Sequence, residues 1–189
     1  AAAPEDRAMT RAGWLVATAF ALGGVNESLA VTPPKLLLWN ACASVPIGLY
    51  ALQPTDVAAV SDLLVVMPTE PLAAYLAERG YLPRGVPLLK RVAALPGQTV
   101  CRSDLTIVID GNVLGRARKD DGMGRPLPNW QGCRVVASNE IFLMNWQSPD
   151  SFDGRYVGAV PRSSIFARAM PLWIDEAGDG RFVWRAATR

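Results

Sequence analysis

Residues 106–114, TIVIDGNVL, decide the fold class that the sequence predicts. A β-branched run leads into Asp110-Gly111, a pair that readily adopts the positive φ angles of a tight hairpin turn. Similar strand-like runs occupy residues 63–67, 86–92, 140–144 and 155–160, with Gly, Pro and Asp between them. Residues 182–184 can pair back on residues 171–174 across a turn at residues 178–180. We therefore expect a mainly β domain built on an antiparallel sheet.

Two segments of this region are not strand-like. Residues 71–80 carry apolar side chains at helical spacing, which predicts a short helix that packs on the sheet. Residues 116–132 are polar and contain Gly and Pro, which predicts a surface loop that is either mobile or functional. The expected architecture is thus a sheet domain with short helices.

The composition indicates a folded protein of one domain. Of the 189 residues, 50% are hydrophobic and 19% are charged, which is typical of a chain that buries a core. The 19 basic and 17 acidic residues give a formal net charge of +2, and no basic block is present that could follow a phosphate backbone. Nucleic acid is therefore not an expected partner.

The three cysteines are Cys42, Cys101 and Cys133, and the chain contains no histidine. Their spacing matches no metal site, so no metal is expected. In an exported protein an odd number suggests one disulfide and one free thiol, and we favour the pair Cys101 and Cys133 because both flank strand-like segments. Three buried, reduced thiols are an equally weighted alternative.

Residues 1–30 form a segment distinct from the β-rich domain that we expect at residues 31–189. The run 12–26 is uncharged and follows Arg7 and Arg11, which is typical of a signal peptide or a short membrane anchor. As a helix this N-terminal apolar run would span about 22 Å, less than the roughly 30 Å of a bilayer core, so it is marginal as a spanning helix. An ordinary buried helix is the alternative.

Residues 28–30, SLA, resemble a cleavage site with small residues at its first and third positions, although an uncleaved tether fits almost as well. Met9 reads as a start residue, which would leave residues 1–8 outside the fold. With or without cleavage, such a segment would take the rest of the chain across a membrane.

A serine and a lysine are the candidate catalytic residues. Ser44 lies in NACASVPIGLY at residues 40–50, and Lys90 lies in LLKRVAALPG at residues 88–97. A serine hydroxyl needs a base to become a nucleophile, and lysine can serve once burial lowers its pKa. On a strand Lys90 shares a face with apolar residues, which predicts that burial, and Pro46 stiffens the loop of Ser44. Taken singly, Ser44 would be an ordinary turn serine and Lys90 a strand-edge lysine that reaches solvent.

These residues belong to three ordered motifs: SVP with GLY at residues 44–50, KRV with LPG at residues 90–97, and DGRYVG at residues 153–158. Their order resembles that of the type I signal peptidases. The longer form N-x-x-x-S-x-P-x-G-L-Y at residues 40–50 is similar to the TraF branch, the conjugative-transfer peptidases that mature pilin subunits. The resemblance runs from about residue 40 to residue 171.

The resemblance implies a Ser-Lys endopeptidase of signal-peptidase fold, without cofactor, that acts on a pilin precursor. We expect the protein to be a monomer. It would lie in the periplasm, tethered to the inner membrane or free. Ser44 would be the nucleophile and Lys90 the general base. Asp153 would be a supporting carboxylate with Arg155 as its partner or as a loop anchor, although a structural ion pair is the alternative and Asp150 is close enough to be confused with Asp153.

Cys42 departs from the motif, because many members of the family have Ser or Thr there to help stabilise the oxyanion. A thiol is a weaker donor, so turnover is expected to be slower but not absent. Three functions remain open. The first is pilin processing, with head-to-tail joining of the product as a further step. The others are general cleavage of exported preproteins, and a non-catalytic scaffold of a secretion or pilus assembly apparatus.

Overall fold

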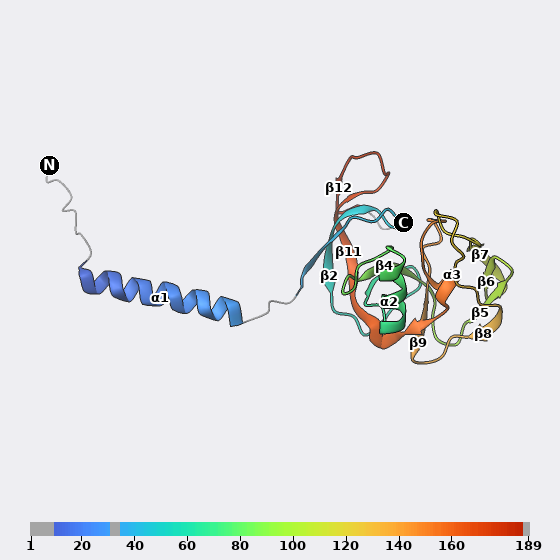
Figure 1. Ribbon diagram of the computed structural model, residues 1–189, viewed down its shortest axis with the longest axis horizontal. Helices are drawn as coiled ribbons and strands as arrows, with labels where there is room; N and C mark the ends of the chain where they lie inside the picture. The colour runs from blue at the N-terminus through green and yellow to red at the C-terminus, as the bar shows by residue number, and fades with distance from the viewer. Residues whose placement is uncertain (1–9, 31–34, 187–189) are drawn as a thin grey trace. The chain divides into compact units, whose positions relative to one another are not determined.

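The computed structural model of the chain describes residues 10–30 and 35–186 (Figure 1). The chain divides into two compact units, residues 1–35 and 36–189. In the first unit, α1 spans Arg11–Ala30, and the hydroxyl of Thr10 accepts a hydrogen bond from the amide of Gly13. Within the described ranges no helix combines the length and the apolar character needed to cross a bilayer. Arg7 and Met9, on which part of the targeting prediction rests, lie outside the described residues.

The larger sheet of the second unit is antiparallel throughout, which confirms the predicted fold class. β12 pairs with β11 at Trp173 and Ile174, as predicted across the turn at residues 178–180. The strand order is β1 (Leu37–Asn40), β2 (Ile47–Gln53), β11 (Ile165–Asp175), β3 (Leu63–Val66), β4 (Leu88–Ala94), β9 (Glu140–Leu143) and β10 (Val160–Pro161), with β12 (Val183–Trp184) attached to β11.

A smaller sheet contains the hairpin from which the fold class was inferred. Its order is β7 (Asn112–Arg116), β6 (Thr106–Ile109), β5 (Thr99–Ser103) and β8 (Gly132–Val135). Asp110 and Gly111 have φ angles of 47° and 83°, which confirms the predicted turn. A disulfide joins Cys101 of β5 to Cys133, its register partner on β8, and Cys42 is a free, exposed thiol. The structure thus has the cysteine pair that the sequence favoured.

Strands β3 and β4 lie at the centre of the core because the larger sheet is covered on both faces there. Successive residues of β3 point to opposite faces. Leu63 and Val65 pack into one hydrophobic cluster, and Leu64 and Val66 pack into another. All of β4 after its first residue is consequently buried. A lysine in the middle of this strand is therefore forced out of water.

Three short helical segments occur among the described residues of the second unit: α2 (Glu70–Glu78), α3 (Gly154–Val157) and a 3-10 turn, η1 (Arg162–Ser164). The first of them confirms the helix predicted at residues 71–80. The strand predicted at residues 155–160 is wrong, because residues 154–157 form α3 and a strand begins only at Val160. The carboxylate of Asp153 caps α3 by accepting a hydrogen bond from the amide of Arg155, a local preference that side-chain alternation does not reveal.

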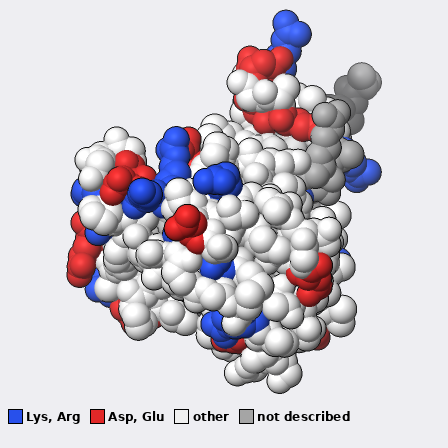
Figure 2. Space-filling model, turned by 90° about the vertical axis from the view of Figure 1, so that its right-hand side faces the viewer, with Lys and Arg blue, Asp and Glu red and all other residues white. Residues whose placement is uncertain are grey.

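The strand β4 and the loop between β7 and β8 lie close to where the sequence predicted them. The strand predicted at residues 86–92 begins at Leu88 and continues to Ala94. The predicted loop at residues 116–132 has no helix or strand between β7 and β8, where an isolated bridge joins Asp120 and Pro126. On the face drawn in Figure 2, basic and acidic side chains alternate around wide uncharged areas, and the described residues of that face form no basic block.

Candidate active site

Asn40, the last residue of β1, holds the loop that carries Ser44. The amide nitrogen Nδ2 of Asn40 donates to the carbonyl oxygens of Cys42, Val45 and Pro46 at 2.8, 3.2 and 3.0 Å. Its Oδ1 accepts a hydrogen bond from the amide of Cys42 at 3.1 Å. One side chain therefore fixes the backbone on both sides of the serine, which explains physically why an asparagine stands at the start of this motif.

Strand β2 fixes the other end of the same loop. The hydroxyl of Tyr50 donates to the carbonyl oxygen of Pro46 at 2.7 Å. Gly48 has a φ of 144°, and a Cβ there would overlap the carbonyl oxygen of Trp173 and come within 2.6 Å of the Cα of Ile174. Only glycine permits this approach of β2 to β11. The serine loop therefore emerges from a tightly packed part of the sheet.

Lys90 lies in the middle of β4 and is 5% exposed. Its register partner on β3 is the buried Leu64. Burial lowers the pKa of the Lys90 amine, and the charge of Arg155 acts in the same direction, whereas Asp153 and Cys42 oppose the change. The burial predicted from the sequence is thus present, and it favours the uncharged amine that a general base requires.

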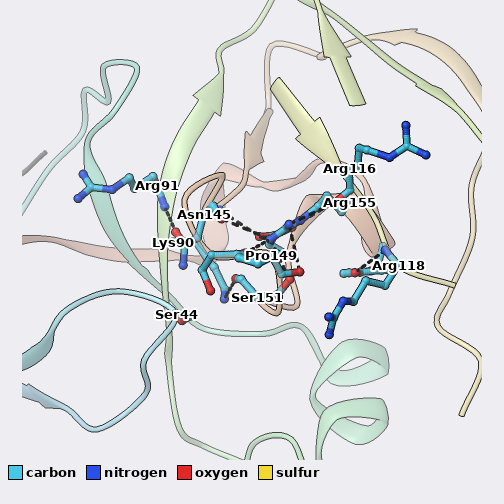
Figure 3. A network of polar contacts seen from close by, with 12 residues as sticks. Ser44, Lys90, Arg91, Arg116, Arg118, Asn145, Pro149, Ser151 and Arg155 are labelled. Carbon is cyan, nitrogen blue, oxygen red and sulfur yellow. Dashed lines mark hydrogen bonds and ion pairs between the residues drawn. The ribbon is translucent and has the colours of Figure 1, made fainter. Parts of the chain in front are cut away.

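Ser151 is the hydrogen-bond partner of this lysine. The Nζ of Lys90 donates to the Oγ of Ser151 at 2.7 Å, and Ser151 is only 2% exposed. Figure 3 shows the two side chains joined, with Ser44 on one side of them and Arg118 on the other. Sequence reasoning missed Ser151. The one available signal was its position two residues before Asp153 of the third motif.

Asp153 and Arg155 form an ion pair of 2.8 Å, with side chains that are 0% and 1% exposed. The Oδ2 of Asp153 also accepts a hydrogen bond from the amide of Asn145 at 3.0 Å. Arg155 in turn donates to the carbonyl oxygen of Ser151 at 3.1 Å. The pair thus holds the loop on which Ser151 lies, so Asp153 acts on Lys90 through that loop and through its charge.

Asp150, which lies close enough in the sequence to be confused with Asp153, is at the surface and not in the buried network. It pairs at the surface with Arg118, and the two side chains are 69% and 53% exposed. The backbone amide of Arg118 donates to the hydroxyl of Tyr156 at 3.0 Å. Two carboxylates that lie only three residues apart in the sequence are therefore in opposite environments: Asp153 is buried and Asp150 is exposed.

Cys42 contacts the candidate nucleophile, since its Sγ lies 3.5 Å from the Oγ of Ser44. Partial removal from water raises the pKa of this exposed thiol, but hydrogen bonds with the hydroxyl and the amide of Ser44 and the positive charge of Lys90 outweigh this, so the pKa is lowered overall. The thiol of Cys42 therefore occupies the position where the resemblance predicts a hydroxyl donor, and its pKa depends on the charge of Lys90.

Ser44, Lys90 and Ser151 line one cavity of about 700 Å³, together with Cys42. Most of the other lining side chains are apolar, as in typical ligand sites of this size. Within residues 10–30 and 35–186, no cluster of three His, Cys, Asp or Glu side chains could hold a metal ion. A buried amine and a hydroxyl that share an apolar cavity can perform acyl transfer through a serine ester.

Comparisons with known proteins place the chain in a family. The family model described as signal peptidase, peptidase S26, matches residues 9–173. Plasmid transfer protein TraF of Escherichia coli is 32% identical over 142 residues, covering 70% of this chain and 80% of TraF. Conjugal transfer protein TraF of Agrobacterium tumefaciens strain 15955 is 37% identical over 147 residues, covering 71% and 80%. A solved signal peptidase I of Enterococcus faecalis V583 is 19% identical, with a TM-score of 0.37 over 61% of this chain and 98% of that chain.

Proposed function

The chain belongs to the signal peptidase S26 family, and on this premise we propose that it is a serine endopeptidase with Ser44 as nucleophile and Lys90 as general base. The observation that carries the proposal is the buried Lys90 amine, with its lowered pKa, in the cavity that Ser44 lines. A neutral amine can accept the proton that an ammonium cannot. Ser151 keeps this amine oriented.

In the acylation step one proton would pass from Ser44 to Lys90 and then from Lys90 to the leaving group. The amine of Lys90 takes the proton of the Ser44 hydroxyl as the Oγ attacks the scissile carbonyl carbon. The resulting oxyanion accepts a hydrogen bond from the amide of Ser44. The ammonium of Lys90 then protonates the leaving nitrogen, so that the carbon–nitrogen bond breaks and an ester on Ser44 remains.

We propose a pilin precursor of a plasmid transfer system as the substrate. The family motifs at residues 40–50 support this, as do relatives whose names refer to plasmid and conjugal transfer. The protein would act as a monomer at the periplasmic face of the inner membrane. The uncharged run at residues 12–26 supports a role of residues 1–30 in targeting or anchoring.

Deacylation can take two routes. Water would give a linear product, whereas the substrate's own amino terminus would give a chain joined head to tail. In the second route Lys90 accepts a proton from the attacking amine and returns one to the Ser44 oxygen as the ester breaks. An intramolecular amine has a high effective concentration, and the apolar lining of the cavity favours it by limiting water. We propose this joining as a further step of the reaction.

Purified variants would test the proposal with a pilin precursor. Ser44→Ala and Lys90→Ala should each abolish cleavage while circular dichroism shows an unchanged fold. Lys119→Ala, at an exposed position outside the cavity lining, is the matched control and should cleave normally. Mass spectrometry of the product distinguishes the routes, because a cyclic chain is one water lighter than a linear one. Undiminished cleavage by a folded Ser44 or Lys90 variant would refute the assignment.

The same family membership keeps a general signal peptidase as a second candidate. This enzyme would cut an unrelated exported preprotein as readily as the pilin precursor, so supplying both substrates separates the two. A serine-directed phosphonate distinguishes either enzyme from a non-catalytic scaffold. A covalent adduct on Ser44 is expected of the enzymes, and no labelling is expected of the scaffold.

A further inference from the structure

The cavity continues beyond Lys90 on the side away from Ser44, where Arg118 lies (Figure 3). Its lining there comes from α2, from the segment that follows this helix, and from the loop at residues 117–131. We call this part the distal arm and define it by its apolar side chains: Leu76, Tyr81, Leu82, Leu127 and Phe152. Except for Leu76 these side chains are only partly buried, so they present apolar surface to whatever enters.

Asp121 fastens the loop wall of the distal arm. Its Oδ2 accepts hydrogen bonds from the hydroxyl of Tyr81 and from the Nε of Arg125, the latter at 2.7 Å. Its Oδ1 accepts from the amides of Met123 and Arg125, both at 2.9 Å. Arg125 also donates to the carbonyl oxygen of Arg79 at 3.0 Å, just after α2. The loop is therefore attached to the helix side of the cavity, which gives the arm a fixed shape.

Aromatic rings also line the arm, and one of them adjoins the residue that holds the base. The ring of Phe152 stacks on Tyr156 at 5.2 Å and on Tyr75 at 5.6 Å between centroids, and lies 5.6 Å from Tyr81. Phe152 directly follows Ser151, which holds Lys90. A group in the distal arm would consequently contact the residue adjacent to the partner of the base.

The charges around the distal arm are compensated by protein partners. Of the charged residues that line the cavity besides Lys90, Arg118 pairs with Asp150, and Asp121 pairs with Arg125. An apolar group entering the arm would thus meet no unpaired charge on its walls, whereas a charged group would lose its hydration without gaining a free partner.

We propose that the distal arm is a subsite that binds one large apolar side chain of the substrate, of the Leu, Met or Phe class, with Asp121 as a positioning residue of its wall. The inference rests on the proposed peptidase function, because a peptide cut at Ser44 must lie in the cavity of which the arm is a part. Continuity with Ser44 and Lys90 favours a peptide side chain over a separate lipid or small molecule as the occupant.

A set of eight-residue peptides would test the subsite. In this set Ala, Leu, Phe or Asp is placed at each position in turn, one position at a time. Their binding to the Ser44→Ala protein is measured by fluorescence polarisation, which needs no chemistry, and their cleavage by the wild type is measured in parallel. At one position Leu and Phe should bind at least about tenfold more tightly than Asp, since burial of an apolar side chain is favourable and burial of an unpaired charge is not. Leu127→Asp in the same Ser44→Ala background should remove this preference, and Leu127→Ala should shift it toward Phe.

Met123→Asp is the matched control, because Met123 lies on the same loop, is 78% exposed and does not line the cavity. Tyr81→Phe, which deletes the hydroxyl bonded to Asp121 and keeps the ring, should raise KM for peptides with Leu or Phe and leave kcat unchanged. A preference that survives Leu127→Asp, or the absence of any preference, would overturn the subsite. Discrimination in binding without cleavage by the wild type would instead contradict the proposed function and leave the subsite standing.

Discussion

Lys90 on β4 donates a hydrogen bond to Ser151, which lies 61 residues further along the chain, and both side chains are buried. Because Lys90 is buried away from water, its hydrogen bond to the Ser151 hydroxyl orients the amine. The loop that presents Ser151 is held by the ion pair of Asp153 and Arg155. The geometry of the base thus depends on a second, buried layer of polar contacts.

Replacing Ser151 should therefore damage turnover more than binding. We expect Ser151→Ala to lower kcat by about 10- to 100-fold with little change in KM, because a misplaced base loses part of its contribution to the barrier. Ser148→Ala is the matched control, since Ser148 contributes its backbone carbonyl to Arg155 and the variant keeps that group. Steady-state kinetics decides the matter. Equal kcat values for Ser151→Ala and the wild type would show that the contact is dispensable.

The pH dependence should report the lowered pKa of Lys90. Activity requires the neutral amine, so kcat/KM should rise with pH, with a midpoint below the usual value of 10.5, because burial lowers the pKa. The negative charge of Asp153 favours the ammonium form, so Asp153→Asn should move the midpoint to still lower pH. The profile is measured on variants shown to be folded. A midpoint that moves upward in Asp153→Asn would contradict this electrostatic account.

The hairpin and α2 could be predicted because local chemistry determines them, whereas the disulfide pair was only favoured, with three reduced thiols as an equally weighted alternative. The turn at Asp110-Gly111 needs only its own φ angles, and the cysteines flank strands that happen to be neighbours. Residues 155–160 alternate like a strand, but the Asp153 cap and the buried ion pair of Arg155 produce α3 instead. Both contacts are local, but side-chain alternation records only the face to which each residue points, and it does not encode a cap or an ion pair between residues two positions apart.

The candidate site likewise combines residues that the sequence predicted with residues that it did not. Ser44 and Lys90 became candidates through their motifs, and the burial of Lys90 was predicted from its apolar strand neighbours. Apart from its position two residues before Asp153, Ser151 has no local mark of its role, which arises only when β4 and the loop after β9 meet. The contribution of residues 117–131 to the cavity was likewise hidden, because polar loop composition predicts exposure but not what the loop faces.

Cys42 should limit activity at high pH. Its thiol has a lowered pKa and contacts Ser44, so deprotonation above that pKa places a negative charge beside the developing oxyanion. The wild type should therefore lose activity on the alkaline side, and Cys42→Ser, which cannot ionise in this range, should keep it. Cys42→Ser should also raise kcat at neutral pH, by up to about 100-fold, if its hydroxyl serves as the second oxyanion donor. An identical alkaline limb in both proteins would exclude the thiol as its cause.

Two neighbouring carboxylates should differ sharply in their effect on stability. Asp153→Ala leaves the guanidinium of Arg155 buried and unpaired, which should cost about 3–5 kcal/mol of the free energy of unfolding. Asp150→Ala breaks only the surface pair with Arg118 and should cost at most about 1 kcal/mol. Urea denaturation of both variants gives the comparison. Similar losses in the two would mean that the buried pair is not the stabilising element of this loop.

Gly48, the second residue of β2 after the serine loop, should tolerate no larger residue. Gly48→Ala puts a methyl group against the backbone of Trp173 and Ile174 at a positive φ, so β2 can no longer lie as close to β11. We expect a loss of about 3 kcal/mol or more, together with reduced activity, because Ser44 depends on the start of β2 for its position. Gly122→Ala is the control, since a Cβ there meets no atom within 4 Å. Thermal melting of the two variants tests the relation, and an unchanged melting temperature for Gly48→Ala would show that the two strands can separate at little cost.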